Sequence, residues 1–539
     1  MSRRTGFLVS VLVAFMAFTA FASGTSEAKN VDSSSKSANM NLTGLPIVKE
    51  KVTLKIAAQR SPLHKVPFAE MEAVKYFEEK TNVHIEWIEM PSSGFTEKAN
   101  LMFASSDLPD AFFIGLTDSM VIQNGYQGSI VPLEKLIEQY APNITKAFTV
   151  LPDYKKVMTT PDGHIYAIAS VDLYMGSMSP DNLFINKTWL DKLGLQMPKT
   201  TEEYRKVLIA FKEKDPNGNG IQDEIPFTSI PGNRQMGFHS LLGAFGVLDE
   251  PLTHLMIKDG KVLFAPTEPG YRKGLEYMHT LQKDGLIDNE MFTQKSNQLF
   301  AKGKGKDMII GSYFDYFPEQ TNGADRVKDY AVLPPLAGPD GIKMWNRARD
   351  IAGIAKNTFE MTKANKYPEI TMRWIDNIMD NGLNTLIFSM GPNGKLLKVN
   401  SDGTWEQDVA STPAGLTYDE YRHSLSLGNS GPFLRLLDLN AKFKMSEPQV
   451  RKLTYYNAVK DYMPKNIFPE VYYTLEIQNE VSLLKTDINK YMESMRAKFV
   501  LDGITDATWN EYVKTLKAMK LDRLMEIYQQ TYDNYQKTK

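Results

Sequence analysis

The chain has 539 residues, a length that favours about two to four domains or subdomains. Hydrophobic residues make up 42%, aromatic residues 11% and charged residues 23% of the sequence, which is ordinary globular usage and excludes intrinsic disorder of its body. The 62 Lys and Arg residues nearly balance the 64 Asp and Glu residues, so the formal charge of −2 gives no electrostatic case for a nucleic-acid partner. Cysteine is absent, which excludes disulfides, thiolate metal sites and cysteine nucleophiles.

The first residues have the pattern of a signal peptide. Two arginines precede an apolar run, Phe7–Phe21, and Ala20-Phe21-Ala22 matches the small-x-small pattern that signal peptidase reads. We expect residues 1–22 to be removed by cleavage after Ala22, which would leave a soluble periplasmic or secreted protein. An uncleaved anchor is the alternative, although the apolar run is shorter than the ~20 residues that a transmembrane helix needs.

The body of the chain alternates strand and helix patterns. Residues 23–45 are rich in Ser, Asn, Lys and Thr and predict a flexible linker that ends near Pro46. A strand pattern at 52–56, a helical pattern at 68–77 and a second strand pattern at 83–87 then fit one βαβ unit. A helix at 95–104 and a strand at 111–114 follow. This alternation predicts an α/β fold with mainly parallel sheets.

Helix dominates from about residue 445 onward. Apolar residues at helical spacing form one long stripe there: Ile477, Val481, Leu484, Ile488, Tyr491, Met495 and Phe499. A stripe of this kind is typical of core packing, so we expect a helical C-terminal region without a functional role for the stripe itself.

Several stretches of the chain resemble the bacterial extracellular solute-binding proteins of carbohydrate ABC importers (family 1), in particular those of the LplA and alginate-binding type. The resemblance covers roughly residues 50–535 in order, and four stretches carry it: Asp107-Leu-Pro-Asp110, Asn182-Leu-Phe-Ile-Asn-Lys-Thr-Trp-Leu-Asp-Lys-Leu-Gly-Leu195 with Pro198-Lys-Thr-Thr-Glu-Glu203, Phe300-Ala-Lys-Gly-Lys-Gly-Lys-Asp-Met-Ile-Ile-Gly-Ser312, and Trp509-Asn-Glu-Tyr-Val-Lys-Thr-Leu-Lys517. Two features depart from the family pattern. No lipidated Cys stands at the cleavage site, and Ser389-Met-Gly-Pro-Asn-Gly394 replaces an expected turn, so nothing is carried over at that position.

The resemblance implies a two-lobed periplasmic-binding-protein fold of type II-like topology, with each lobe a mainly parallel sheet flanked by helices. It also implies a non-enzymatic, monomeric substrate-binding component of an ABC transporter, which captures a neutral or acidic oligosaccharide between its lobes and delivers it to membrane permease subunits. Without a Cys, the protein would not be lipidated. The expected segments are a first lobe from 46–170, a second lobe from 171–305, a return to the first lobe over 306–390, and a second-lobe and helical C-terminal part over 391–539.

A polar loop at 215–224 has the spacing of a calcium-binding loop. Oxygen-bearing side chains recur at alternate positions, Gly220 allows a sharp turn, and Ile221 can supply its carbonyl. The twelfth position of an EF-hand loop falls on Pro226, so Glu224 would have to supply the final carboxylate. A polar turn held by Asx hydrogen bonds is the alternative from spacing alone. Because the family carries such loops at this place, we expect a structural Ca²⁺ held by Asp215, Asn217, Asn219, Ile221, Asp223 and Glu224.

The sugar site is expected where aromatic rings meet hydrogen-bonding groups, because sugars present flat apolar faces edged with hydroxyls. Trp345, Arg347 and Arg349 alternate, so a strand there would place all three on one face. The alternative is an ordinary solvated strand face. Further candidates follow apolar segments, where a cleft would lie: Tyr313, Asp315, Tyr316, Asp172 and Tyr174. Their alternative role is loop packing on a lobe.

No catalytic motif stands out in the sequence. The seven histidines form no His-Glu-x-x-His pair, and there is no Gly-x-Ser-x-Gly elbow and no phosphate-binding Gly-rich loop. Scattered carboxylates keep a secreted glycan-active enzyme, a glycoside hydrolase or polysaccharide lyase, as the alternative function. A peptide receptor on a similar scaffold is a third hypothesis.

Overall fold

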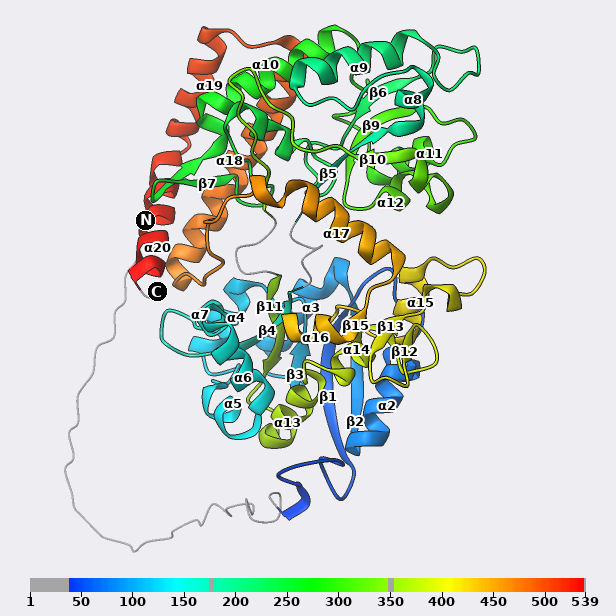
Figure 1. The fold of residues 1–539 in the computed structure, drawn as a ribbon. Coiled ribbons are helices and arrows are strands. Elements are labelled where there is room, and N and C mark those ends of the chain that lie inside the picture. Colours follow the sequence, from blue (N-terminus) through cyan, green and yellow to red (C-terminus); the bar gives the residue numbers. More distant parts are fainter. Residues whose placement is uncertain (1–37, 174–178, 180, 348–352, 538–539) are drawn as a thin grey trace, which may run out of the picture.

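The computed structural model describes residues 38–173, 179, 181–347 and 353–537, and these residues form two lobes joined by helices and crossing segments (Figure 1). The predicted signal peptide, 1–22, lies outside the described residues. The expected linker is described only from residue 38, and its last residues are folded: Met40 forms a β-bridge with Val48 and is 7% exposed. Asn39 Oδ1 also accepts a hydrogen bond from Glu50 N at 2.7 Å. The folded boundary therefore lies before Pro46, because one apolar side chain in a polar stretch is enough to attach it to the core.

The first lobe contains a six-stranded sheet of order β14-β4-β11-β3-β1-β2. The predicted βαβ unit is present, with β1 parallel to both β2 and β3. Only β11 runs against the other five strands, since it pairs antiparallel with both β3 and β4. The strands are β1 Val52–Arg60, β2 Val83–Pro91, β3 Ala111–Phe113, β4 Ala167–Asp172, β11 Ile354–Met361 and β14 Leu434–Arg435.

The second lobe contains a four-stranded sheet of order β10-β5-β9-β6, in which β5 alone runs against the others. These strands are β5 Asn182–Asn186, β6 Ile225–Thr228, β9 Ile310–Asp315 and β10 Tyr330–Val332. Both reversed strands, β5 and β11, are the first in their sheet after the chain has crossed from the other lobe. A strand that enters from the partner lobe must run away from it, so the remaining strands point their carboxyl ends toward the other lobe. The predicted α/β two-lobed fold is confirmed with this detail added.

The path of the chain between the lobes differs from the expected segments. Residues 306–390 were expected to return to the first lobe, but β9 and β10 belong to the second sheet and the return begins only at β11. Residues 391–444 pack on the first lobe, whose core includes Leu396, Leu425 and Leu439. The second lobe resumes with α17 (Glu447–Val459), whose last residue lies in the second-lobe core. Apolar patterns identify strands but not the sheet that each one joins.

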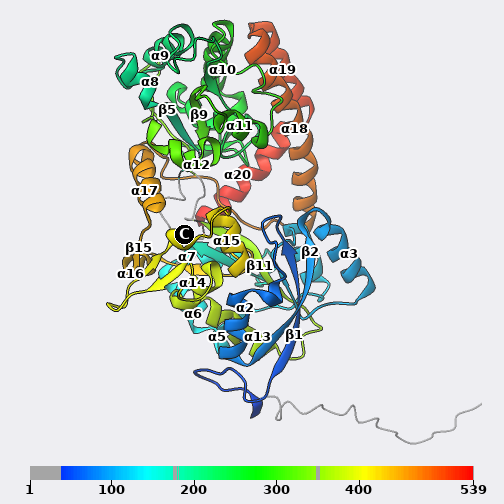
Figure 2. The same cartoon turned by 90° about the vertical axis from the view of Figure 1, so that its right-hand side faces the viewer.

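Helices cover both sheets and form the C-terminal region, as expected from the apolar stripe at 477–499. Figure 2 shows α18 and α19 beside the second lobe, with the lower end of α18 reaching toward the first lobe. Two smaller sheets pair β7 Leu255–Lys258 with β8 Lys261–Phe264, and β12 Leu397–Val399 with β13 Trp405–Gln407 and β15 Phe443–Lys444. The first-lobe helices are α2 Glu72–Thr81, α3 Phe95–Ser105, α4 Asp118–Tyr126, α5 Glu134–Tyr140, α6 Pro142–Val150, α7 Pro152–Met158, α13 Pro368–Ile378, α14 Leu383–Met390, α15 Tyr418–Leu425 and α16 Leu437–Lys442. The remaining helices are α8 Lys187–Lys192, α9 Thr201–Glu213, α10 Pro269–Lys283, α11 Ser296–Gly303, α12 Pro318–Asn322, α17, α18 Leu475–Asp502, α19 Asp506–Ala518 and α20 Leu521–Lys537.

Candidate ligand-binding face and cation loop

The side of each lobe that faces the other is built from strand ends. Asp172 is the last residue of β4. Its Oδ1 lies 3.6 Å from Nη1 of Arg435, which is the last residue of the neighbouring strand β14. Asp315 ends β9 in the second lobe and is followed at once by Tyr316. Open α/β sheets bind ligands at the carboxyl ends of their strands. Charged and aromatic residues from both lobes therefore stand where a ligand held between the lobes would be.

Helix α17 places Lys452 between these groups. Its ammonium nitrogen lies 3.7 Å from the ring centroid of Tyr316 and 3.5 Å from that of Phe317. The two rings meet edge to face, with centroids 4.8 Å apart. Burial lowers the pKa of Lys452 to about 7, against the attraction of Asp172 from the first lobe. We call Lys452, Tyr316 and Phe317 the aromatic corner.

A pocket in the second lobe opens beside the segments that lead to the first lobe. Its lining comes from residues between Leu248 and Ile257, from Asn346 and Arg347, and from the stretch 464–470, with Arg234 completing it. Polar groups alternate with Phe468 and the apolar side chains in this lining. Arg347 Nη1 donates to the Lys465 carbonyl at 3.4 Å, which ties two of the three walls together. A mixed apolar and hydrogen-bonding lining of this kind suits a hydroxylated organic ligand.

Buried charges fix the wall of this pocket from behind. The Asp249 carboxylate accepts hydrogen bonds from His239 Nδ1 at 2.9 Å and from His254 Nδ1 at 2.6 Å. Burial opposes ionisation of Asp249, but the two histidines outweigh it and lower the pKa of this carboxyl. The Asp249 carbonyl accepts from Asn346 Nδ2 at 3.0 Å. The charged cluster thus holds Asn346, and with it the start of Arg347, in one position.

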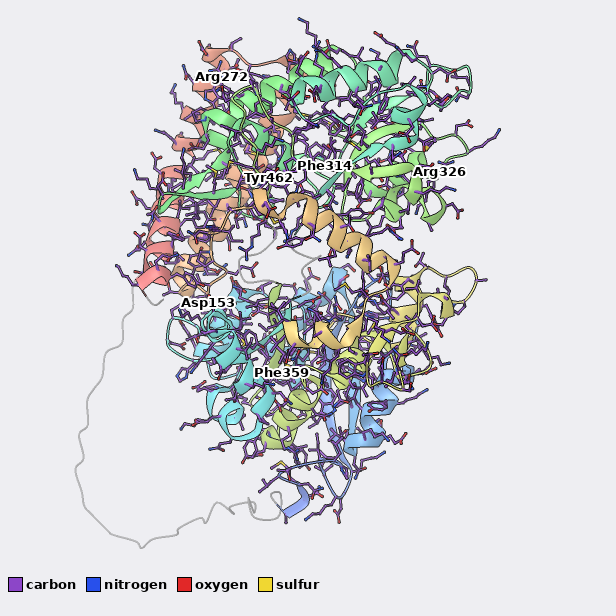
Figure 3. The ribbon with its side chains drawn as sticks, viewed as in Figure 1. Asp153, Arg272, Phe314, Arg326, Phe359 and Tyr462 are labelled. Atoms are coloured by element: carbon purple, nitrogen blue, oxygen red, sulfur yellow. The ribbon has the colours of Figure 1, made fainter. Side chains whose placement is uncertain are left out.

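The predicted strand at Trp345, Arg347 and Arg349 is wrong. Residues 342–347 have no strand structure, and Arg349 lies outside the described residues. Trp345 is only 2% exposed, stacks on Phe314 with ring centroids 6.2 Å apart, and donates its indole N–H to the Asp181 carbonyl. Figure 3 labels Phe314 inside the second lobe. Trp345 is therefore a core residue in this structure. Burial of its large apolar ring stabilises the fold, and the alternation of Trp and Arg in the sequence does not show whether the ring is buried.

The other predicted ligand residues separate into two groups. Tyr313 is fully buried, stacks on Phe184 and accepts a hydrogen bond from Asn322, and Asp315 is also fully buried, so neither presents its side chain to the inter-lobe side. Tyr316 and Asp172 do lie on that side, while Tyr174 falls outside the described residues. Tyr313 and Asp315 lie on the same face of β9, as period-two alternation predicts. Alternation does not predict their burial, which arises because the strand is covered on both faces.

The loop at 215–224 connects α9 to β6 and is curled around its own acidic residues. Asp215 Oδ1 and Oδ2 accept from the backbone N–H groups of Gly218 and Gly220 at 2.9 and 3.0 Å. Asn219 Nδ2 donates to both carboxylate oxygens of Asp223, at 3.3 and 3.1 Å. Gly220 has φ +77°, the left-handed conformation that its position in the turn was expected to require. The loop therefore has the Asx hydrogen bonds that a polar turn would have.

Glu224 is the feature of this loop that hydrogen bonding does not explain. Both of its carboxylate oxygens are buried without a hydrogen-bond partner. Burial raises the pKa of Glu224, and the nearby charges of Asp215 and Asp223 raise it further. Within the described chain, no group of three or more His, Cys, Asp or Glu side chains is arranged to hold a metal. The oxygen donors and the uncompensated carboxylate nevertheless fit a hard cation, whose charge would offset the repulsion among the three acids.

A chain with two α/β lobes, strand ends facing each other and several crossings between them is a two-lobed binding protein by architecture. Residues 65–382 match the family described as bacterial extracellular solute-binding protein. The chain is 36% identical over 509 residues to the fructooligosaccharide ABC transporter substrate-binding protein FusA of Streptococcus pneumoniae serotype 4 (strain ATCC BAA-334 / TIGR4), covering 91% of this chain and 92% of FusA. This chain therefore belongs to the bacterial extracellular solute-binding proteins.

Solved structures agree with this assignment. FusA of S. pneumoniae in complex with kestose matches with a TM-score of 0.80 and 34% identity over 90% of this chain and the whole of the FusA chain in that structure. A FusA EF-hand mutant in complex with fructo-nystose matches equally well, with a TM-score of 0.80 and 34% identity over the same shares of both chains. The alginate-binding protein AlgQ2 without calcium ion matches with a TM-score of 0.66 over 92% of this chain and 99% of AlgQ2, and at 24% identity it shows the fold alone.

Sequence reasoning missed the residues that the structure brings together at the inter-lobe side. Lys452 stands in an ordinary-looking helix, and neither its position nor that of Arg435 carries a motif. Asp249, His239 and His254 are spaced irregularly along the chain. Phe317 directly follows Tyr316, so an aromatic pair after a buried strand was the one local signal that could have extended the prediction.

Proposed function

We propose that this chain is the substrate-binding subunit of an ABC importer and captures an oligosaccharide between its two lobes. The single observation that carries this proposal is the similarity to FusA over both lobes, at 36% identity and 91% coverage of this chain. The inter-lobe groups support it, because aromatic rings beside charged hydrogen-bonding side chains suit the faces and edges of sugar rings. Delivery to membrane permease subunits follows from the same role.

The ligand class that we propose is a fructose-containing neutral oligosaccharide. The structures of FusA hold kestose and fructo-nystose, both neutral sugars of this class. The cations at the inter-lobe side, Lys452, Arg435 and Arg347, leave an acidic oligosaccharide as the second candidate. Arg435 stands beside Asp172, which offsets much of its charge, and both FusA ligands are neutral, so the neutral ligand is the better fit.

We also propose a structural Ca²⁺ in the loop at 215–224, held by Asp215, Asn217, Asn219, Asp223 and Glu224 with the Ile221 carbonyl. The unpartnered Glu224 oxygens and the EF-hand mutant of FusA support it. The ion would compensate the negative charges of the loop and make the turn rigid, which is a structural role and not a catalytic one.

For location, we propose secretion by the N-terminal signal peptide, cleavage after Ala22 and a monomeric, unlipidated mature protein. Membership in an extracellular family supports export. Among the helices that the structure describes, none combines the length and apolar character needed to cross a membrane.

Isothermal titration calorimetry on the secreted protein tests the proposed function. The panel contains kestose, a longer fructooligosaccharide, an oligogalacturonate and a neutral peptide of similar mass. We expect saturable one-to-one binding of the fructose-containing sugars and much weaker binding of the other two. Preferred binding of the oligogalacturonate would replace the neutral ligand with the acidic one, and preferred binding of the peptide would overturn the carbohydrate class.

The same samples, incubated for a day and analysed by chromatography, test the enzyme alternative. A transport receptor returns its ligand unchanged, so the kestose peak should keep its area. New reducing ends or unsaturated products in proportion to protein concentration would show a glycoside hydrolase or lyase instead.

A further inference from the structure

Helix α17 is attached to both lobes, so its middle turn lies between them. At its start, Ser446 Oγ donates to Gln407 Oε1 at 2.8 Å, and Gln407 belongs to the small sheet packed on the first lobe. At its end, Val459 lies in the core of the second lobe. Figure 1 shows α17 crossing from the lower lobe to the upper one. Lys452, on the second turn, therefore projects into the space where a ligand would touch both lobes.

The carboxylates around Lys452 each have an arginine of their own. Asp172 pairs with Arg435 at 3.6 Å and Asp419 pairs with Arg422 at 3.2 Å, both in the first lobe. The third acid, Glu319 at the start of α12, pairs with Arg451. All three carboxylates attract Lys452 without approaching it within the 4.0 Å of an ion pair.

Lys452 is the cation left over from this arrangement. Among the described residues it forms no ion pair and no hydrogen bond, and its ammonium group rests on the Tyr316 and Phe317 rings. Ring faces attract a cation but accept no conventional hydrogen bond, so the three N–H donors of Lys452 have no acceptor among the described residues. Burial lowers the pKa of Lys452 to about 7, because desolvation disfavours the charged ammonium form. Ionisable groups with strongly shifted pKa values cluster at functional sites, and Lys452 combines such a shift with a position between the lobes.

We propose that the aromatic corner of Lys452, Tyr316 and Phe317 is a sugar subsite, in which Lys452 donates to hydroxyl or ring oxygens of one sugar unit and thereby sets ligand affinity. This inference rests on the proposed function. A sugar ring supplies what the corner lacks, because its oxygens accept from the ammonium group while its C–H face covers the aromatic edges. Asp315 holds the corner in place, since its carboxylate accepts from Tyr316 N at 2.6 Å.

Calorimetry with kestose on three variants tests the subsite. Lys452→Met keeps the unbranched stem and removes the donors, Lys452→Arg keeps the charge, and Lys304→Met is the control. Lys304 also stands over an aromatic ring, that of Phe300 at 5.3 Å, but on the exposed end of α11. We expect Lys452→Met to weaken kestose binding by about tenfold or more, Lys452→Arg to recover part of the loss, and Lys304→Met to bind as wild type does.

A chemical readout keeps the test decisive even if a variant fails to fold. Acylation of wild-type protein at neutral pH, followed by peptide mass spectrometry, should label Lys452 less when kestose is bound and should label Lys304 equally in both states. Equal labelling of Lys452 in both states, or affinity of Lys452→Met within about twofold of wild type, overturns the subsite. If wild type binds no saccharide of the panel, the proposed function fails and the subsite fails with it. If wild type binds kestose but Lys452→Met binds it equally well, only the subsite fails, so the two failures are distinguishable.

Discussion

Asp315 serves the inter-lobe side without facing it. It is fully buried at the end of β9, where its carboxylate accepts from Tyr316 N at 2.6 Å and from Thr321 Oγ1 at 2.6 Å. These bonds fix the backbone that carries the two rings of the aromatic corner and anchor α12. Burial raises the pKa of Asp315 to about 7 even though the hydrogen bonds oppose that shift. The residue was predicted to touch ligand, and the structure instead gives it a supporting position.

The raised pKa of Asp315 predicts a specific pH dependence of stability. In the native protein the carboxyl titrates near pH 7, while in the unfolded chain it titrates near its ordinary value of about 3.9. Between these values the native state binds more protons than the unfolded state, so the free energy of unfolding falls as the pH rises. The decrease is at most about 1.4 kcal/mol per pH unit and ends near pH 7.

Comparison of wild type with Asp315→Asn isolates this contribution from all other titrating groups. Urea unfolding at several pH values should show the variant gaining on wild type from about pH 4 to about pH 7, with a constant difference above that. Parallel stability curves for the two proteins would mean that Asp315 titrates normally in the native state.

At the scale of elements, the loop at 215–224 is the clearest case of local sequence specifying local structure. Alternating Asp and Asn side chains turn the backbone back on itself through bonds to N–H groups two to five residues further along. The charges of Asp215 and Asp223 raise the pKa of Glu224, so the three acids of the loop disfavour one another's ionisation. Their mutual repulsion opposes the fold of the loop unless a cation balances it.

Calcium removal should therefore destabilise the second lobe through this loop. If Ca²⁺ binds only the native state, calcium at 100 times its dissociation constant stabilises it by about 2.7 kcal/mol, so a chelator should lower the melting temperature of wild type by several degrees. Asp215→Ala, which loses a ligand, should start lower and not respond. Asp402→Ala is the matched control. Asp402 Oδ1 accepts a hydrogen bond from Thr404 N in an unrelated Asp-Gly turn, so this substitution should leave the chelator response intact. Equal chelator shifts in wild type and Asp215→Ala would reject the site.

At the scale of the whole molecule, the segments that join the lobes decide how the lobes can move. Helix α18 is fixed at both ends: Tyr472, just before it, is buried in the first-lobe core and donates to Asn357 Oδ1, while Phe499 and Val500 in its last turn pack in the second-lobe core. Lys356 Nζ also donates to the Val471 carbonyl at 3.2 Å. A helix held this way acts as a strut, so relative motion of the lobes is confined to bending at the crossing segments.

Ligand binding should close the lobes around this strut. Kestose contacts that involve both lobes favour the closed arrangement, so small-angle X-ray scattering should show a smaller radius of gyration at saturating kestose. A saccharide that calorimetry finds not to bind should leave the scattering unchanged. Saturable kestose binding without any change in the radius of gyration would show that the ligand sits on one lobe alone.

Much of the fold followed from the sequence, because its elements are specified by neighbours in the chain. Alternation at Val52, Leu54 and Ile56 gave β1, and the long apolar stripe gave α18. The order of the family-like stretches identified a two-lobed receptor. The sheet that β9 joins did not follow, since its apolar run would pair equally well in either lobe. Trp345 shows the same limit, because a tryptophan beside arginines is consistent with both a sugar platform and a core residue until its surroundings are known.

By itself, therefore, the sequence determined the class of protein, the absence of any disulfide or thiolate chemistry, and the oxygen-rich loop at 215–224, all of which depend on residue types and short spacings. Only the tertiary structure decided which groups meet between the lobes. Lys452, Tyr316 and Asp172 lie far apart in the chain and come from α17, the end of β9 and the end of β4. Their proximity arises because strands that run toward the partner lobe bring their carboxyl ends to a common face.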